Sequence, residues 1–243
     1  YADVAEVAVS SLTGAVVADF ERQHGRIADG ELLMLALGRL GGRALTHASD
    51  LDLILLFTGE LLHESDGVRP LGASRYFNRL GQRVTAALSV QSAAGRLYEV
   101  DTRLRPQGTQ GPLVASLDAF ARYQREDAWT WEHMALTRAR PVYGSAAGRA
   151  AVQGAIDAAL RQPRDAGQTL ADIQKMRAVM AQHKPPKGAL DVKLLPGGLV
   201  DAEFAIHSQQ LRHGVALRPE LDLALTDLIA ARLAPAERSE EHT

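Results

Sequence analysis

The sequence contains no cysteine among its 243 residues, so neither a disulfide nor a thiolate metal site can contribute to its fold or chemistry. It also lacks an uninterrupted apolar run of about 18 residues, the length that a membrane-spanning helix needs. No internal repeat or low-complexity tract is visible. These absences favour a globular protein of a reducing compartment, and we expect a cytoplasmic location and no membrane partner.

The chain has no excess of positive charge. Its 27 lysine and arginine residues face 29 aspartate and glutamate residues, which gives a net charge of −2. A nucleic-acid-binding protein normally carries a basic field or stripe that neutralises phosphates. We therefore expect no nucleic-acid partner, and a nucleic-acid polymerase is the least favoured class of enzyme. With 46% hydrophobic residues, the chain can bury one large core or two small ones.

Both ends of the sequence carry unusual features. Residue 1 is Tyr rather than an initiator Met, and no signal-like region precedes the first expected helix, so we expect the chain to begin inside a longer protein. Residues 238–243 could be translated from a common sequencing adapter. We predict that they are a non-native tail.

Residues 37–57 carry the strongest chemical signal. Asp50 and Asp52 are two residues apart and lead into an apolar run, which predicts a buried strand with both carboxylates on one face of its leading end. Such a pair of carboxylates usually lies at a solvated strand edge. Beside a buried run, their two charges are costly in free energy unless a metal or hydrogen bonds compensate. Gly41 and Gly42 would let backbone N–H groups approach a phosphate. Together these features indicate nucleotidyl transfer.

A second informative strand is predicted over residues 97–105. Asp101, Arg103 and Arg105 alternate there with other residues, so we expect all three side chains on one face. Asp101 would then complete a carboxylate triad from a neighbouring strand. The two arginines would either grip phosphate oxygens or pair with acids in a structural ladder.

The three carboxylates fit two-metal phosphoryl chemistry. Two Mg²⁺ ions about 4 Å apart would be bridged by Asp50 and Asp52, one organising a triphosphate and the other lowering the pKa of the attacking hydroxyl. Asp101 would bind the second ion and take the proton. The positive charge that faces the leaving pyrophosphate would come from Arg39, Arg43, Arg103, Arg105 or Lys193.

The rest of the chain reads mainly as helix, which makes the predicted class α+β. Helices are expected at residues 4–20, 74–89, 116–124, 127–139, 146–160, 169–182 and 221–233, and a short strand at 32–37. Asp201 is expected in the first turn of a further helix, where its charge favours the helix dipole. Trp129 and Trp131 are expected to pack in the core.

Four ordered motifs resemble the glutamine synthetase adenylyltransferase family. They are Gly38-Arg-Leu-Gly-Gly-Arg-Ala-Leu-x-x-x-Ser-Asp-Leu-Asp-Leu, Tyr98-Glu-Val-Asp-Thr-Arg-Leu-Arg-Pro, Ala128-Trp-Thr-Trp-Glu-His-Met-Ala-Leu-Thr-Arg-Ala-Arg and Pro196-Gly-Gly-Leu-Val-Asp-Ala-Glu-Phe. The resemblance spans residues 36–211. The Asp-x-Asp element alone would indicate only the DNA polymerase β-like nucleotidyltransferase superfamily.

This resemblance implies a DNA polymerase β-like core, a small mixed sheet with helices, followed by an all-α helical domain. We accordingly predict a catalytic domain with a leading helix at residues 1–143 and a helical domain at 144–237. The resemblance also implies Mg²⁺ and ATP as ligands. It assigns metal binding to Asp50, Asp52 and Asp101, and nucleotide contact to Gly41, Gly42 and Ser49.

The family carries two similar catalytic halves, one adding AMP from ATP to a tyrosine hydroxyl of glutamine synthetase and one removing it by phosphorolysis. The adding half is resembled more closely by residues 65–71, 98–101 and 129–133. Its reaction would release pyrophosphate, and the modification of glutamine synthetase would regulate nitrogen assimilation. Control by the PII signalling protein would act through regions outside this sequence. Three alternatives stay open: the removing half, a catalytically weak nucleotide-sensing module, and a nucleotidyltransferase that acts on another protein.

Overall fold

The computed structural model describes residues 1–93 and 95–234, so the tail predicted at 238–243 lies outside the described residues. The chain divides into two compact units. Unit 1 comprises Tyr1–Ala128 and Arg138–Ala159. Unit 2 comprises Trp129–Thr137 and the chain from Leu160 onward, which the structure describes to residue 234. The domain boundary predicted at 143/144 falls inside unit 1, immediately before helix α6 (Ala146–Arg161).

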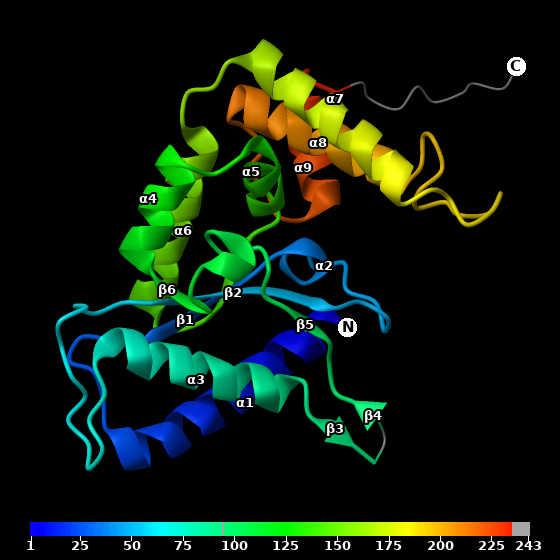
Figure 1. Ribbon diagram of the computed structural model, residues 1–243. Coiled ribbons are helices and arrows are strands. Elements are labelled where there is room, and N and C mark those ends of the chain that lie inside the picture. Colours follow the sequence, from blue (N-terminus) through cyan, green and yellow to red (C-terminus); the bar gives the residue numbers. More distant parts are fainter. Residues whose placement is uncertain (94, 235–243) are drawn as a thin grey trace, which may run out of the picture. The chain divides into compact units, whose positions relative to one another are not determined.

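Unit 1 is built around a small mixed sheet (Figure 1). Its strands are β1 (Leu32–Ala36), β2 (Leu51–Phe57), β5 (Val100–Asp101), β6 (Val114–Ser116) and β7 (Arg140–Tyr143), and a separate hairpin joins β3 (Gln91–Ser92) to β4 (Gly95–Arg96). The order is β5-β2-β1-β7, with β6 also paired to β2. β1 runs antiparallel to β2 and β7, whereas β5 and β6 run parallel to β2. The expected α+β class with a small mixed sheet is confirmed.

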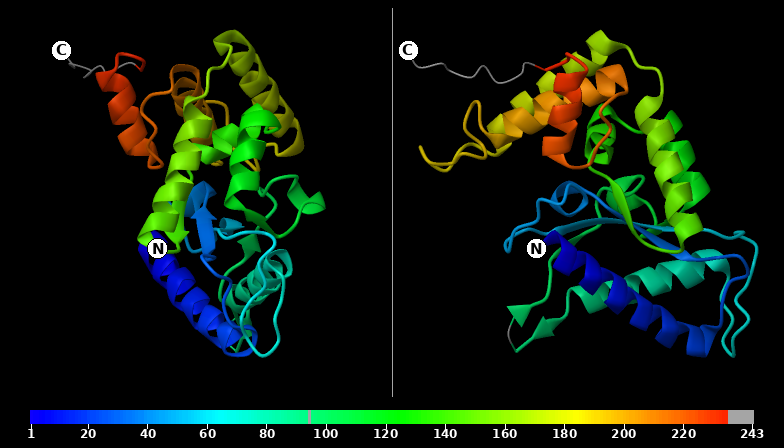
Figure 2. Two further views of the ribbon diagram at one scale, coloured as in Figure 1. Left: turned by 90° about the vertical axis from the view of Figure 1, so that its left-hand side faces the viewer. Right: turned by 180° about the vertical axis from the view of Figure 1, so that it is seen from behind.

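Helices α1 (Ala2–His24) and α3 (Ala73–Leu88) lie side by side across one face of this sheet (Figures 1 and 2). Unit 1 also contains α2 (Gly38–Gly41), the 3₁₀ turn η1 (Gly108–Gln110) and α4 (Leu117–Glu126). Every residue of β1 is buried, and Asp52 is the one residue of β2 that is not. Each large apolar side chain buried here contributes about 1.5–3 kcal/mol. The acidic end of β2 therefore belongs to the best-packed strand pair of the unit.

Tyr76 of α3 ties the C-terminal end of α1 to this core. Its ring is 3% exposed and meets Phe20 edge-on, with centroids 4.9 Å apart. Its hydroxyl donates a hydrogen bond of 2.9 Å to the carbonyl of Gly25. Burial, and next the charge of Glu21, raise the pKa of Tyr76 from 10.0 to about 12. The folded state therefore favours the neutral phenol.

A Tyr76→Phe substitution is expected to change the alkaline stability of the protein. The unfolded chain ionises at Tyr76 from pH 10.0, whereas the folded chain does so at about 12, so stability that is complete below pH 10.0 is lost between these values. At neutral pH the variant should be about 1 kcal/mol less stable, because the hydrogen bond is gone. Urea melts at increasing pH should show this difference change by roughly 2 kcal/mol, so that it falls to zero and the variant becomes the more stable protein. A constant difference from neutral pH to pH 12 would contradict the account.

Unit 2 is helical. It contains α5 (Thr130–Leu136), α7 (Ala166–His183), α8 (Leu199–His213) and α9 (Leu221–Ala230), of which α8 packs against both α7 and α9. Asp201 lies in the first turn of α8, as predicted. Its carboxylate accepts a 2.7 Å hydrogen bond from the N–H of Gly197 and pairs with Arg177 of α7. No helix in the described part of the chain combines the length and apolar character needed to cross a membrane.

The expectation that Trp129 and Trp131 pack in the core is wrong, because their side chains are 71% and 42% exposed. Helix α5 begins one residue after Trp129, whose backbone N–H donates to the carboxylate of Glu132 at 2.9 Å. Glu132 and His133 are buried instead. The helix therefore turns its acid and histidine inward, and the two indoles stay at the surface.

Candidate functional site

The leading end of β2 brings the three predicted acids together within unit 1. Asp52 is the second residue of β2 and stands in register with Asp101 of the parallel strand β5. Neighbouring strands lie about 4.8 Å apart, so the two carboxylates project from adjacent positions. Asp50 lies immediately before β2, two residues from Asp52, and its negative charge acts on Asp52. The charges of Asp101 and Asp50 both act on Asp52, which agrees with a cluster of the three acids, and their role as a catalytic triad stays a prediction.

Backbone hydrogen bonds fix these positions from both sides. The N–H of Leu51 donates to the carbonyl of Glu99 at 2.8 Å, which joins β2 to the segment before β5. The N–H of Leu37 donates to the carbonyl of Asp52 at 2.9 Å, which joins β2 to the end of β1. A hollow of about 280 Å³ opens at this end of the strands, lined by Asp50, Glu99, Val100, Asp101, Thr102 and Arg103.

Asp52 lies in an environment that disfavours its own negative charge. Burial, and next the charges of Asp101 and Asp50, raise the pKa of Asp52, while Arg138 and Arg103 oppose that rise. Carboxylates that repel one another in a partly buried place are stabilised by a cation between them. Oxygen donors of this kind suit a hard divalent ion such as Mg²⁺. The types of residue and their charges suit the predicted metal, and its binding by Asp50, Asp52 and Asp101 stays a prediction.

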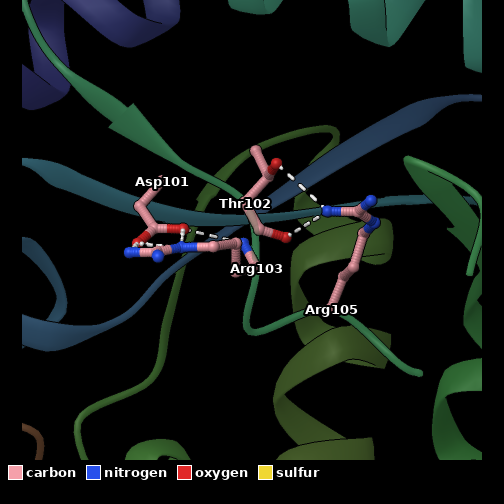
Figure 3. A network of polar contacts seen from close by, with 4 residues as sticks. All are labelled: Asp101, Thr102, Arg103 and Arg105. Carbon is pink, nitrogen blue, oxygen red and sulfur yellow. Dashed lines mark hydrogen bonds and ion pairs between the residues drawn. The ribbon is translucent and has the colours of Figure 1, made fainter. Parts of the chain in front are cut away.

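The guanidinium group of Arg103 forms an ion pair with one of these acids, Asp101 (Figure 3). Nε of Arg103 donates to both carboxylate oxygens of Asp101, at 3.0 and 2.9 Å, and Nη2 donates to Oδ2. The backbone N–H of Arg103 adds a bond of 2.8 Å to Oδ1. The hydrogen bonds from Arg103 hold the pKa of Asp101 below its usual value. Among residues 1–93 and 95–234, no three acidic or histidine side chains form a ready-made metal-binding group.

The strand predicted over residues 97–105 is present only at Val100–Asp101 (β5), so the prediction is wrong for residues 97–99 and 102–105. The carboxylate of Asp101 accepts the N–H of Arg103, a local bond that competes with continued strand pairing. Figure 3 shows the consequence: Arg103 folds back on Asp101, whereas Arg105 extends the other way to Thr102. Nη1 of Arg105 donates to the carbonyl of Thr102 at 2.8 Å and to its hydroxyl at 3.3 Å. The two arginines therefore do not share a face.

The glycine turn upstream supports Asp52 through Gly38, whose part sequence reasoning missed. Gly38 has a φ of +54°, and a Cβ atom there would lie 2.0 Å from Oδ2 of Asp52. Gly41 and Gly42 are buried, and their N–H groups donate to the carbonyls of Leu37 and Gly38 at 2.8 and 3.1 Å. Nucleotide contact by these two glycines stays a prediction. A glycine directly after the predicted strand 32–37 was the available signal for the tight turn at Gly38.

Arg140 is a second residue that sequence reasoning missed. Its guanidinium donates to the carbonyls of Gly41 and Leu40 at 3.3 and 3.4 Å, and it pairs with Glu6 of α1 at 2.8 Å. Arg140 thus ties the glycine turn to β7 and α1. Residues from three distant parts of the chain meet in this contact, and no local pattern indicates it.

Two further residues were predicted to contact the nucleotide. The hydroxyl of Ser49 closes a turn, accepting the N–H of Thr46 at 3.0 Å and bonding its hydroxyl at 2.9 Å. Lys193 belongs to unit 2, in the exposed turn before α8. For both residues, contact with a nucleotide stays a prediction.

Residues 2–155 match the family model described as glutamate-ammonia ligase adenylyltransferase. Similar proteins include one from Brucella melitensis, 49% identical over 205 residues that cover 84% of this chain and 21% of that protein. One from Mesorhizobium japonicum is 43% identical over 236 residues, covering 97% of this chain and 24% of that protein. Both are named bifunctional glutamine synthetase adenylyltransferase/adenylyl-removing enzyme. The chain thus spans about a fifth to a quarter of the length of these relatives.

Proposed function

Since the chain belongs to the glutamate-ammonia ligase adenylyltransferase family, we propose that it transfers AMP from ATP to a tyrosine hydroxyl of glutamine synthetase. The observation that carries this proposal is the carboxylate cluster at the leading end of β2. Asp52 and Asp101 stand in register on adjacent parallel strands, and Asp50 comes just before them. A nucleotide-binding module without catalysis has no need for three acids at one point.

The proposed reaction replaces a phosphoanhydride bond of ATP with a phosphoester bond to tyrosine. The tyrosine oxygen bonds to the α-phosphorus of ATP, the bond from that phosphorus to the β-phosphate oxygen breaks, and pyrophosphate leaves with the electron pair. The hydroxyl proton passes to a carboxylate of the cluster. Mg²⁺, when bound by Asp50, Asp52 and Asp101, would neutralise phosphate charge and lower the pKa of the attacking hydroxyl.

The rest of the site acts by positioning. The strand pairing of β2 with β1 and β5 fixes the backbone of Asp52, and Gly38 sets the space available to its carboxylate. Arg140 braces the glycine turn that contains Gly38. Rigid placement of this kind lowers the barrier because the reacting groups need little reorganisation.

We favour the adding over the removing direction. Three segments support this choice, because their sequences resemble the adding half of the family more closely: residues 65–71, 98–101 and 129–133. The names of the bifunctional relatives include both activities, and the carboxylate chemistry serves either one. Only the choice of substrate separates the two directions.

A pair of assays tests the proposal. In the first, the protein is incubated with Mg²⁺, α-labelled ATP and unmodified glutamine synthetase, and label on the synthetase is measured. In the second, it is incubated with Mg²⁺, orthophosphate and pre-adenylylated synthetase, and release of ADP is measured. We expect label in the first assay and little ADP in the second.

Two results would contradict this proposal. Release of ADP without labelling would assign the removing activity. If neither assay shows activity and the protein still binds ATP in a filter assay, a nucleotide-sensing module would be favoured.

A further inference from the structure

The ion pair between Arg103 and Asp101 engages a carboxylate that the proposed reaction needs for binding the metal ion. Asp101 is one of the three acids assigned to the metal, yet Arg103 donates to both of its carboxylate oxygens. A metal ion and this guanidinium would therefore compete for the same oxygens. Either Arg103 permanently withholds Asp101 from the metal, or it moves when the metal binds.

The surroundings of Arg103 favour movement. Its side chain is 77% exposed, whereas that of Asp101 is 19% exposed, so the arginine can leave without opening the core. An exposed ion pair is weak because water screens it, and a divalent ion attracts a carboxylate more strongly than a guanidinium does. Arg105 behaves differently. It is partly buried, and two bonds to Thr102 fix its Nη1 atom.

We propose that Arg103 is a movable cation that holds Asp101 in the absence of ligands, yields it to the divalent metal ion, and then contacts the phosphates of the bound nucleotide. This inference rests on the proposed function and adds an order of events to it. The hollow beside Asp50 and Asp101 is lined by Arg103 itself, so the released guanidinium stays at the site where phosphates would enter. Phosphate oxygens accept the same forked hydrogen bonds as a carboxylate.

A thermodynamic consequence follows from this exchange. A metal ion that binds alone must displace Arg103, which then loses its partner. A metal ion that binds with a nucleotide leaves Arg103 a new partner in the phosphates. Metal and nucleotide should therefore each strengthen the binding of the other, through this one residue.

The first test measures Mn²⁺ binding without nucleotide, by calorimetry or by the electron paramagnetic resonance signal of free Mn²⁺. Arg103→Gln should bind Mn²⁺ about fivefold more tightly than the unsubstituted protein, because the competitor is gone. Arg105→Gln is the matched control, since it removes the same charge nearby without touching Asp101. It should change the Mn²⁺ affinity by less than about twofold. Thermal melts establish that both variants are folded.

The second test measures binding of a non-hydrolysable ATP analogue in the presence of Mn²⁺. Arg103→Gln should bind the analogue about fivefold more weakly, the opposite sign to its effect on the metal alone. A merely structural role for Arg103 would weaken both. Equal effects of the two substitutions on Mn²⁺ binding would overturn the proposal, because general charge would then account for them.

The outcomes also separate this inference from the proposed function. If the unsubstituted protein binds Mn²⁺ and the analogue, and Arg103→Gln changes neither affinity, the exchange is refuted and the transferase site stands. If the unsubstituted protein binds neither ligand, both are refuted.

Discussion

Replacing Asp52 with Asn is expected to lower the rate of AMP transfer about a thousandfold, while the protein stays folded. Asp52 is the central acid of the cluster, because it comes two residues after Asp50 and stands in register on β2 with Asp101 of β5. An amide keeps the shape of the side chain but removes the charge that would hold the metal. Label transferred to glutamine synthetase per unit time measures this effect.

The same substitution should leave the thermal stability unchanged or raise it. Burial and the charges of Asp101 and Asp50 raise the pKa of Asp52, which means that the folded protein disfavours its ionised form. Neutralising the side chain relieves that repulsion, so activity and stability should move in opposite directions. Such divergence separates a site residue from a residue needed for folding.

Asp118→Asn provides the matched control for this experiment. Asp118 is an exposed acid in the first turn of α4 and is absent from the cluster. Its loss should cost about 0.5 kcal/mol of helix-dipole stabilisation and leave transfer unchanged. Activity of Asp52→Asn within about tenfold of the unsubstituted protein would contradict the assignment of Asp52.

Gly38→Ala is expected to reduce transfer about a hundredfold, because it displaces the carboxylate of Asp52. The new Cβ would lie 2.0 Å from Oδ2 of Asp52, a distance that no pair of unbonded atoms tolerates. The φ of +54° at this position adds backbone strain of about 1 kcal/mol. Transfer rate and unfolding free energy should therefore both fall.

Gly214→Ala separates these two effects. Gly214 has a similar φ of +63° at the end of α8, but a Cβ atom there meets nothing within 4 Å. Its substitution should cost about the same 1 kcal/mol of stability and leave transfer intact. If the two glycine variants lose activity equally, general destabilisation explains the loss, and the contact with Asp52 has no special role.

The parts of the site that sequence could predict are those encoded locally. Asp50 and Asp52 are two residues apart before an apolar run, so the strand and its burial follow from one short segment. The position of Asp101 beside them required a pairing of distant strands. The alternation over residues 97–105 and the family resemblance supplied that prediction, and the register of β2 with β5 agrees with it.

The parts that sequence could not predict depend on contacts between distant segments or on side chains that alter the backbone. The alternation over residues 97–105 looked like a strand, but the carboxylate of Asp101 captures the N–H of Arg103 and ends it. The indoles of Trp129 and Trp131 were expected inside because large aromatic side chains usually are. The role of Gly38 is seen only in the folded chain, where a Cβ atom at this position would lie 2.0 Å from Oδ2 of Asp52.

The central claim is that the three acids of unit 1 form the metal-dependent centre for nucleotidyl transfer. The most direct measurement is a crystal structure of the protein with Mn²⁺ and a non-hydrolysable ATP analogue, in which anomalous scattering locates the manganese. We predict an anomalous peak bound by Asp50, Asp52 and Asp101, with the phosphates of the analogue beside it. An ordered analogue whose manganese lies away from all three carboxylates would contradict the claim.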